Sequence, residues 1–265
     1  MVRNMNKKII LLANDRPGIE ICKYLIDHGE TILRLYIHDP EEQKYANEII
    51  SNSRLDQRNI FLAGTLKDPD HIKEISNIHF DYIISVYWAH LLPKSLLDSA
   101  REGTVNFHPA LLPINRGWYP HVHSIIDGSP LGVTLHAMDE SADTGPIWAQ
   151  KEISLSPYDT AGTIYDKLQK EIVALFIETW PKILDKSIVP IPQDNSRAVY
   201  HKKKEIDALD KVNLESSMKV REIINLLRAR SFGTMGFAFY EVDGEKVYVN
   251  IKLGKSNNFK KKDGI

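Results

Sequence analysis

The stretch KIILLANDRPGIEICKYLIDHGETILRLYI, residues 8–37, decides the fold class of this 265-residue chain. Residues 8–13 and 31–37 are short apolar runs with the length and composition of buried strands, and residues 18–28 between them have the pattern of a helix. A strand, a helix and a second strand in this order favour a parallel sheet.

The alternation of strands and helices continues to residue 188. Further strands are expected near residue 60 and at residues 81–86, 104–107, 132–138 and 147–153, and further helices at residues 40–51, 69–76, 119–126 and 160–184. The Trp180-Pro181 pair is expected to break or bend the last helix. The pattern predicts an α/β fold with a mostly parallel sheet covered by helices on both faces.

Composition changes after Ile188, where prolines and small polar residues mark a linker. We assign residues 1–188 to a large N-terminal domain, 189–204 to the linker and 205–265 to a small C-terminal domain. The small domain offers a helix at 216–229 and strands at 236–242 and 246–253, and Asp243-Gly244 between the strands is a strong hairpin signal. The sequence therefore predicts a small α+β unit with a frayed, lysine-rich tail from residue 255.

Charge and cysteine content restrict the class of protein. The formal net charge is −1, so no general field attracts nucleic acid or acidic lipid. The single cysteine, Cys22, cannot form an internal disulfide, which is compatible with a reducing cytoplasm. The apolar run at residues 9–13 is too short for a membrane span or a signal peptide. We expect a soluble, cytoplasmic protein whose partners include neither nucleic acid nor a membrane.

Polar residues of three kinds gather at one predicted edge of the sheet. Asn106 and His108 are two apart, so their side chains share a face at the carboxyl end of a strand, where open α/β sheets bind ligands. Asp143 adds a carboxylate from the loop before Gly145. An amide, an imidazole and a carboxylate form a set that can polarise a carbonyl and move a proton. An Asn-x-His pair alone is more often structural, so spacing leaves both interpretations open.

Other features argue against a metal or a dinucleotide cofactor. His121 and His123 lack a supporting cluster of carboxylates or cysteines, so we assign them, with His136, to packing or to substrate contact. The first strand-to-helix turn contains only Gly18, without the glycine triplet of a dinucleotide-binding loop. A complete phosphate-binding Gly-x-x-x-x-Gly-Lys-Ser/Thr loop is also absent from the sequence.

Four stretches, in this order, resemble the folate-dependent formyltransferase family. They are VNFHPALLP at 105–113, Arg116-Gly117, GVTLH at 132–136 and Asp143-Thr144-Gly145. The family includes methionyl-tRNA formyltransferase, glycinamide ribonucleotide formyltransferase and the sugar N-formyltransferases of bacterial polysaccharide synthesis. The resemblance is strong over residues 80–185, and residues 220–253 resemble the start of a small C-terminal domain found in several members.

The resemblance implies a Rossmann-like catalytic domain that takes the formyl group from N10-formyltetrahydrofolate and needs no metal. Asn106 matches the asparagine that holds the formyl oxygen, His108 the histidine that assists proton transfer, and Asp143 the aspartate that orients the histidine. Two further segments match those that line the folate pocket: Ser85, Tyr87, Trp88, Ala89, His90 and Leu91, and then Met138, Asp139, Glu140 and Ala142. Trp88 and His90 depart from the small residues common in that segment.

The acceptor amine is open among three classes. Members that act on tRNA carry a long basic loop after the second strand and a larger C-terminal barrel, whereas residues 38–43 here are short and acidic and would repel phosphates. The glycinamide ribonucleotide enzyme carries a glycine-rich loop that residues 14–17 do not supply. An amino sugar fits best, by the run Asn115, Arg116, Gly117 and Pro120, by the reduced C-terminal unit and by the stretch at 200–205.

On this interpretation the chain formylates a nucleotide-linked amino sugar for polysaccharide synthesis, such as that of the O-antigen of lipopolysaccharide. A dTDP-linked 4-amino-4,6-dideoxyhexose, such as dTDP-4-amino-4,6-dideoxyglucose, is the first candidate and its 3-amino isomer the second. The residues expected to contact the acceptor are Asn14, Arg16, Tyr87, Asn115, Arg116, Trp118 and Tyr119. The resemblance also implies a homodimer. A folate-binding module or sensor without turnover is the alternative from another class, and the intact Asn106, His108 and Asp143 argue against it.

Overall fold

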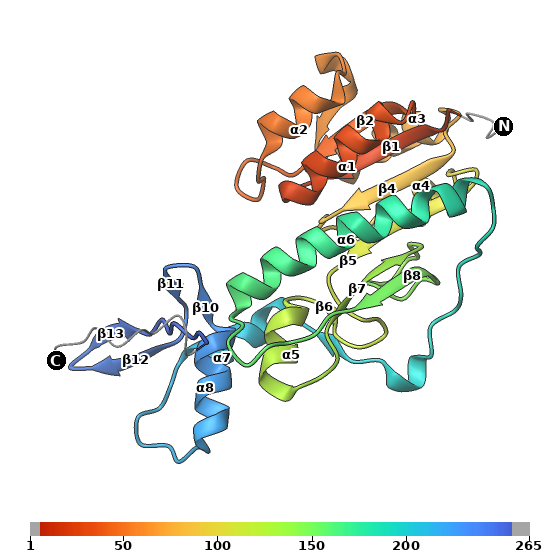
Figure 1. Ribbon diagram of the computed structural model, residues 1–265. Helices are drawn as coiled ribbons and strands as arrows, with labels where there is room; N and C mark the ends of the chain where they lie inside the picture. Colours follow the sequence, from red (N-terminus) through yellow and green to blue (C-terminus); the bar gives the residue numbers. More distant parts are fainter. Residues whose placement is uncertain (1–5, 256–265) are drawn as a thin grey trace.

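A computed structural model describes residues 6–255 of the protein and contains one large central sheet (Figure 1). The sheet has seven strands in the order β3-β2-β1-β4-β5-β7-β8. The first five in that order are parallel, whereas β7 is antiparallel to both β5 and β8. The strands are β1 Lys8–Ala13, β2 Thr31–Ile37, β3 Ile60–Leu62, β4 Tyr82–Val86, β5 Gly103–His108, β7 Gly132–His136 and β8 Ile147–Glu152. The predicted fold class is confirmed.

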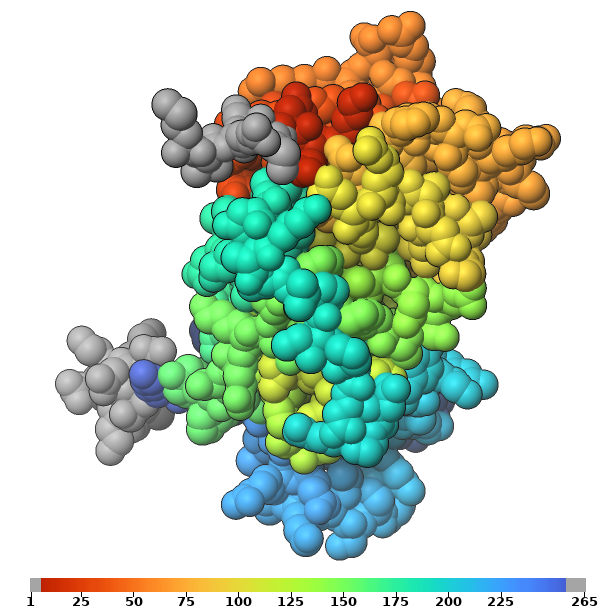
Figure 2. Space-filling model, turned by 90° about the vertical axis from the view of Figure 1, so that its right-hand side faces the viewer, coloured from red at the N-terminus to blue at the C-terminus, as the bar shows by residue number. Residues whose placement is uncertain are grey.

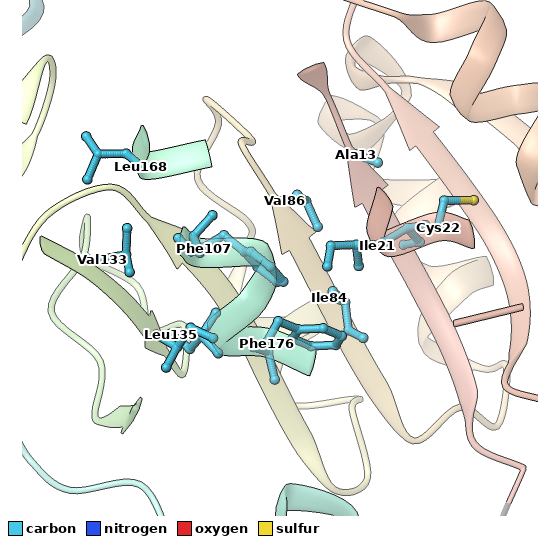
Figure 3. Packing of buried hydrophobic residues seen from close by; sticks show 14 of the residues in the cluster. Ala13, Ile21, Cys22, Ile84, Val86, Phe107, Val133, Leu135, Leu168 and Phe176 are labelled. Carbon is cyan, nitrogen blue, oxygen red and sulfur yellow. The ribbon is translucent and has the colours of Figure 1, made fainter. Parts of the chain in front are cut away.

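Helices cover both faces because side chains of the central strands alternate between two cores. Ile9 and Leu11 of β1 pack with α1, α2, α5 and α6, whereas Ile10 and Leu12 face α3 and α4. In Figure 3, side chains of β4 and β5 lie against Ile21 of α1 and Phe176 of α6. The helices are α1 Asp15–Asp27, α2 Ala46–Ser53, α3 Pro69–Ser76, α4 Lys94–Leu97, α5 Pro120–Asp127 and α6 Ala161–Leu184, with short 3-10 turns η1 Gln57–Asn59 and η2 Ala63–Lys67.

The segment after α6 packs along the N-terminal domain before it reaches the C-terminal unit. Ile191 bridges Ile147, and β9 (Tyr200–His201) pairs with β6 (Arg116–Gly117). Figure 2 shows this teal segment lying on the surface, running down toward the light-blue C-terminal unit. The remaining elements are η3 Asn195–Arg197, η4 Lys203–Ile206, α7 Asp207–Asp210, α8 Val220–Ala229, β10 Ser231–Phe232, β11 Met235–Gly236, β12 Phe239–Val242 and β13 Glu245–Tyr248.

Several predicted elements differ from the structure in their limits. The first helix, expected from residue 18, begins at Asp15. The helix expected at 40–51 begins only at Ala46, because the backbone N–H of Lys44 donates to Asn14 Oδ1 and its carbonyl accepts from Asp15, which holds the preceding loop against the end of β1. Pro181 does not end α6, since it lies in the last turn and leaves one backbone donor missing. The helix expected at 216–229 begins at Val220, after a turn in which Ser216 donates to the Asn213 carbonyl.

The predicted hairpin is present in a shorter form, as β12 and β13. Its turn residues Asp243 and Gly244 have φ of 52° and 84°, and positive φ at both positions is what a two-residue turn of the type I′ class requires. The tail predicted to fray lies almost entirely outside the described residues, which end at Lys255. Between residues 6 and 255, every helix is too short or too polar to cross a membrane.

Candidate active site

A cavity of about 440 Å³ opens where β4 and β5 end. Asn106 and His108 of β5 line it, as does Asp143 from the loop between β7 and β8. The three predicted catalytic residues therefore meet in one cavity. Its size falls in the range of small-molecule sites.

The Asp143 carboxylate is held by His108 and by the Gly117 backbone, and it lies close to His136. Its Oδ1 lies 3.3 Å from Nδ1 of His108 and 3.5 Å from Nε2 of His136, and its Oδ2 accepts a hydrogen bond of 2.9 Å from the Gly117 backbone. Burial works to raise the pKa of Asp143, but the charge and hydrogen bond of His108 hold that pKa well below its usual range. Asp143 is accordingly an anion inside the cavity wall.

His108 faces a hydrogen-bond acceptor at each ring nitrogen. Nδ1 faces Asp143, and Nε2 lies 3.1 Å from the backbone carbonyl of Asn115. Burial works to lower the pKa of His108, yet Asp143 and the Asn115 carbonyl outweigh it and raise that pKa above the usual 6.5. A doubly protonated imidazolium satisfies both acceptors, so His108 is a buried cation next to Asp143.

The register of the antiparallel pair places Asn106 opposite His136. Nδ1 of His136 donates to the Ala137 carbonyl at 2.7 Å, which leaves Nε2 of a neutral ring to accept from Asn106 Nδ2 at 3.0 Å. Asn106 Oδ1 accepts from the Ser85 hydroxyl at 2.7 Å, and this fixes the amide plane. One hydrogen of Asn106 Nδ2 therefore has no partner in this set and is available to a carbonyl oxygen in the cavity.

His136 belongs to the site, although its sequence context suggested only packing or substrate contact. Its position at the end of a predicted strand could have indicated a place in the site. That inference also requires the register that pairs His136 of β7 with Asn106 of β5. Gln193 of the linker is a second contributor that the sequence did not indicate. Its Nε2 donates to the carbonyls of Asp143 and Gly145 at 2.8 and 2.7 Å, and so holds the Asp143 loop from behind.

The cavity has an apolar side that contains most of the predicted folate contacts. Leu92 and Leu97 contribute to this side, together with the predicted residues. Of the predicted folate residues, Ser85, Tyr87, Trp88, Ala89, His90, Leu91, Met138, Asp139 and Ala142 line the cavity. Glu140 lines an adjoining cleft beside α4. Trp88 stacks on His38 at 4.5 Å between ring centroids, which explains how the chain accommodates a large residue there.

The other side of the cavity is aromatic. Tyr87, Trp118 and Tyr119 line it as predicted, and Tyr165 and Tyr200 join them. Tyr165 also donates to Asp15 Oδ2 at 2.8 Å, so its ring is fixed from behind.

The other four predicted acceptor contacts lie outside the cavity lining. Asn115 donates to Ser124 and Ser129 and accepts from His201, which leaves its side chain no free polar atom. Arg116 is buried and binds Gln193 and Asn195 of the linker. Asn14 bonds the backbone of residues 42 and 44, and Arg16 bonds the Tyr45 hydroxyl at 3.1 Å. The structure gives Asn14, Asn115 and Arg116 internal roles, whereas Arg16 is exposed and uses only its Nε in this bond.

Two groups of side chains have the spacing of metal ligands within residues 6–255: His38, Glu42 and His90, and His123, His201 and Glu205. In the first group, Nε2 of His38 accepts a hydrogen bond from the Ala89 backbone at 3.2 Å. In the second group, His123 and His201 stack face to face at 3.4 Å, an arrangement in which the ring lone pairs run parallel and do not converge on one point. Neither geometry favours a metal.

Comparisons with known proteins agree with this geometry. Residues 36–180 match the family model described as formyl transferase, and residues 205–255 match the N-formyltransferase dimerization C-terminal domain. The chain is 30% identical over 228 residues to methionyl-tRNA formyltransferase of Lactobacillus johnsonii, which covers 83% of this chain and 71% of that one. It is 34% identical over 178 residues to dTDP-4-amino-4,6-dideoxyglucose formyltransferase of Mycobacterium tuberculosis, which covers 66% of this chain and 74% of that one.

Solved structures extend the likeness to nearly the whole chain. A 4-N formyltransferase from Francisella tularensis superposes with a TM-score of 0.81 at 27% identity, over 94% of this chain and 98% of that one. A formyltransferase from Anoxybacillus kamchatkensis, in complex with UDP-4,6-dideoxy-4-formamido-L-AltNAc and tetrahydrofolate, superposes with a TM-score of 0.53 at 27% identity. That match covers 76% of this chain and 88% of the other.

Proposed function

Because the chain belongs to the formyl transferase family, we propose that it moves a formyl group from N10-formyltetrahydrofolate to the amino group of a nucleotide-linked amino sugar. The first candidate acceptor is dTDP-4-amino-4,6-dideoxyglucose, and its 3-amino isomer is the second. The observation that carries the proposal is the convergence of Asn106, His108 and Asp143 in one cavity that apolar and aromatic side chains also line.

The apolar side of the cavity suits a pterin ring. Trp88, Leu91, Leu92, Leu97 and Met138 offer flat and aliphatic contact surface next to the catalytic cluster. The Anoxybacillus relative binds tetrahydrofolate, which supports the same use of the cavity here. The cofactor supplies a formyl carbon that an uncharged amine can attack.

The side chains of the site stabilise the charge that develops on the formyl oxygen during attack. Asn106 directs its free Nδ2 hydrogen into the cavity, and His108 adds a positive charge at the same place. Both interactions strengthen as the oxygen becomes negative, so they favour the transition state over the ground state. Asp143 keeps His108 protonated and fixes its ring plane, and it is itself fixed by Gly117.

The pH dependence of the reaction tests this arrangement through Asp143→Asn. A histidine whose pKa is raised stays charged to higher pH, so wild-type kcat should fall on the alkaline side only as pH rises through a value above 6.5. Without the carboxylate, burial dominates and the His108 pKa falls, so the alkaline limb should move to lower pH. The profile of kcat against pH measures the shift, with Asp185→Asn as the surface control. Superimposable profiles for Asp143→Asn and wild type would refute the role of Asp143.

A nucleotide-linked acceptor is favoured over a tRNA by two features. The segment between β2 and α2 is short and contains Glu41 and Glu42, which would repel phosphates. The C-terminal unit also matches the dimerization domain of N-formyltransferases. The similarity to methionyl-tRNA formyltransferase keeps tRNA as the second candidate acceptor.

The acceptor is identified by incubating the protein with N10-formyltetrahydrofolate and a panel of amines. The panel contains the dTDP-linked 4-amino and 3-amino sugars and methionyl-tRNA, and mass spectrometry detects a gain of one formyl group. We expect the 4-amino sugar to react fastest. Formylation of the tRNA alone would overturn the proposal, and folate binding without any product would favour a non-catalytic module.

We further propose that residues 1–188 form the catalytic domain, 189–204 the linker and 205–265 a domain that joins two copies of the chain. Val220 and Ile224 lie one turn apart on α8 and are 73% and 41% exposed, so an apolar stripe faces outward. The product would serve cytoplasmic synthesis of polysaccharide such as O-antigen.

A charge on this apolar stripe should separate the two copies. We expect Val220→Glu to lower the mass measured by sedimentation from that of two chains to that of one, because a second copy would bury the carboxylate. Arg221→Glu, on an exposed neighbouring position, controls for the added charge. A dimer that survives Val220→Glu unchanged would argue against α8 as the contact.

A further inference from the structure

We propose that the rim formed by Tyr200, His201, Lys202 and Lys203, called here the linker rim, binds the diphosphate of the acceptor, with Lys203 as its cation. This inference rests on the proposed function, since it concerns the nucleotide end of a nucleotide-linked sugar. It assigns a role to a basic stretch that the sequence alone left as part of a linker.

The charge of the cavity lining requires a cation outside it. Among the described residues that line the cavity there is no lysine or arginine, and the buried His108 is already paired with Asp143. A diphosphate carries negative charges that need donors or cations when they leave water. The cavity therefore suits the sugar, and the diphosphate must lie at its mouth.

Lys203 is a cation that contacts an aromatic residue of the cavity lining. Its Nζ lies 4.7 Å from the ring centroid of Trp118, which lines the cavity together with Tyr200. In the described part of the chain no carboxylate lies within ion-pair distance of Lys203. Lys203 thus carries an unneutralised charge beside the mouth of the cavity.

Two other basic residues near the site are already engaged. Lys44 lies 3.3 Å from Asp15 Oδ2, and Arg116 bonds Gln193 and Asn195. A diphosphate at either position would have to displace an existing partner. Lys203 can bind the diphosphate without losing an ion pair.

The linker rim is held in fixed register with the catalytic cluster. Trp118 N donates to the His201 carbonyl at 3.1 Å, and Arg116 N donates to the Val199 carbonyl at 2.8 Å. Gly117 lies between them, and a Cβ there would approach the His201 carbonyl to 2.3 Å. Because Gly117 N also holds Asp143, one short strand links the rim to the carboxylate that orients His108. The rim is preorganised, which lowers the entropic cost of binding.

The arrangement gives the acceptor a direction. The amine reaches Asn106 and His108 inside the cavity, and the sugar lies among Tyr87, Tyr119 and Tyr165. The diphosphate extends out of the cavity past Trp118 and contacts Lys203. The ligand class recognised at the rim is therefore a nucleoside diphosphate, read through its phosphates.

Calorimetric titration with dTDP, and with thymidine as the ligand lacking phosphates, tests the inference on the full-length protein. We expect Lys203→Ala to weaken dTDP binding about 10-fold or more, since a charge-assisted contact is lost, and to leave thymidine binding unchanged. Lys203→Arg should restore most of the affinity. Lys204→Ala, the adjacent exposed lysine, is the matched control and should bind dTDP like wild type.

Equal dTDP affinity in wild type and Lys203→Ala would overturn the assignment, as would equal losses in Lys203→Ala and Lys204→Ala. Kinetics give a second readout, in which Lys203→Ala should raise KM for the sugar nucleotide and leave kcat within a small factor. Failure of the proposed function has a different signature. The wild type would then formylate none of the nucleotide-linked amines, while binding of dTDP that depends on Lys203 would still support the rim.

Discussion

Replacing His108 with alanine is expected to lower kcat for formyl transfer by about 100- to 1,000-fold, the usual effect of losing one group that stabilises the charge of a developing oxyanion. The reason lies in the pair that His108 forms with Asp143, 3.3 Å away, which keeps a positive charge next to the reacting carbonyl. KM for the acceptor should change little, because the interaction forms mainly in the transition state. Steady-state rates on the identified acceptor measure both quantities.

His79→Ala is the matched control for this variant, since His79 is exposed and lies outside the cavity. Thermal unfolding of His108→Ala must be measured as well, because the substitution leaves the Asp143 anion without its main partner. A folded His108→Ala protein with a kcat within a few-fold of wild type would remove His108 from the chemistry. It would leave Asn106 as the main donor to the oxygen.

Gly145→Ala is expected to lower kcat by about 100-fold while the sheet stays folded. A Cβ at Gly145 would lie 1.9 Å from the Ala137 carbonyl, a backbone atom, so the loop that carries Asp143 must move. Displacement of a catalytic group by about 1 Å commonly costs 100-fold in rate. The strain should also reduce the free energy of unfolding by about 1–3 kcal/mol.

Gly64→Ala serves as the control, because its Cβ would meet the nearest atom, Asp39 Oδ1, at an ordinary 3.4 Å. Denaturant titration and steady-state kinetics on both variants separate loss of stability from loss of alignment. If Gly145→Ala keeps both the wild-type free energy of unfolding and full activity, the Asp143 loop tolerates movement. The fixed geometry around His108 would then not be required.

Elements with local signals were predictable to the residue. The sequence limits of β1, β2 and α3 agree with the structure, and α3 shows why: Asp68 caps it by accepting from Asp70 N, and Pro69 occupies its first turn. The start of α2 was not predictable, because tertiary hydrogen bonds between Asn14 and Lys44 set it. No local pattern at residues 40–45 contains that information.

The same distinction applies to the site. The two-residue spacing of Asn106 and His108 placed them on one face of β5, whereas the pairing of Asn106 with His136 follows from the antiparallel direction of β7. Asn115 and Arg116 carry the polar groups that a ligand contact would need, yet the fold uses them to hold its own segments together. Tertiary neighbours, and not sequence neighbours, decide whether a polar side chain contacts a ligand or makes hydrogen bonds within the fold.

The hydrogen bonds of Gln193 to the carbonyls of Asp143 and Gly145 have a consequence for how this protein can be divided. A fragment that stopped at residue 188 would retain all seven strands of the sheet and all three proposed catalytic side chains, yet it would lack the hydrogen bonds of Gln193 behind the carboxylate. The proposed end of the catalytic domain at residue 188 therefore excludes a residue that supports the site. A chimera that exchanges its C-terminal portion with that of a relative should be joined beyond His201, so that Gln193 stays with the catalytic residues.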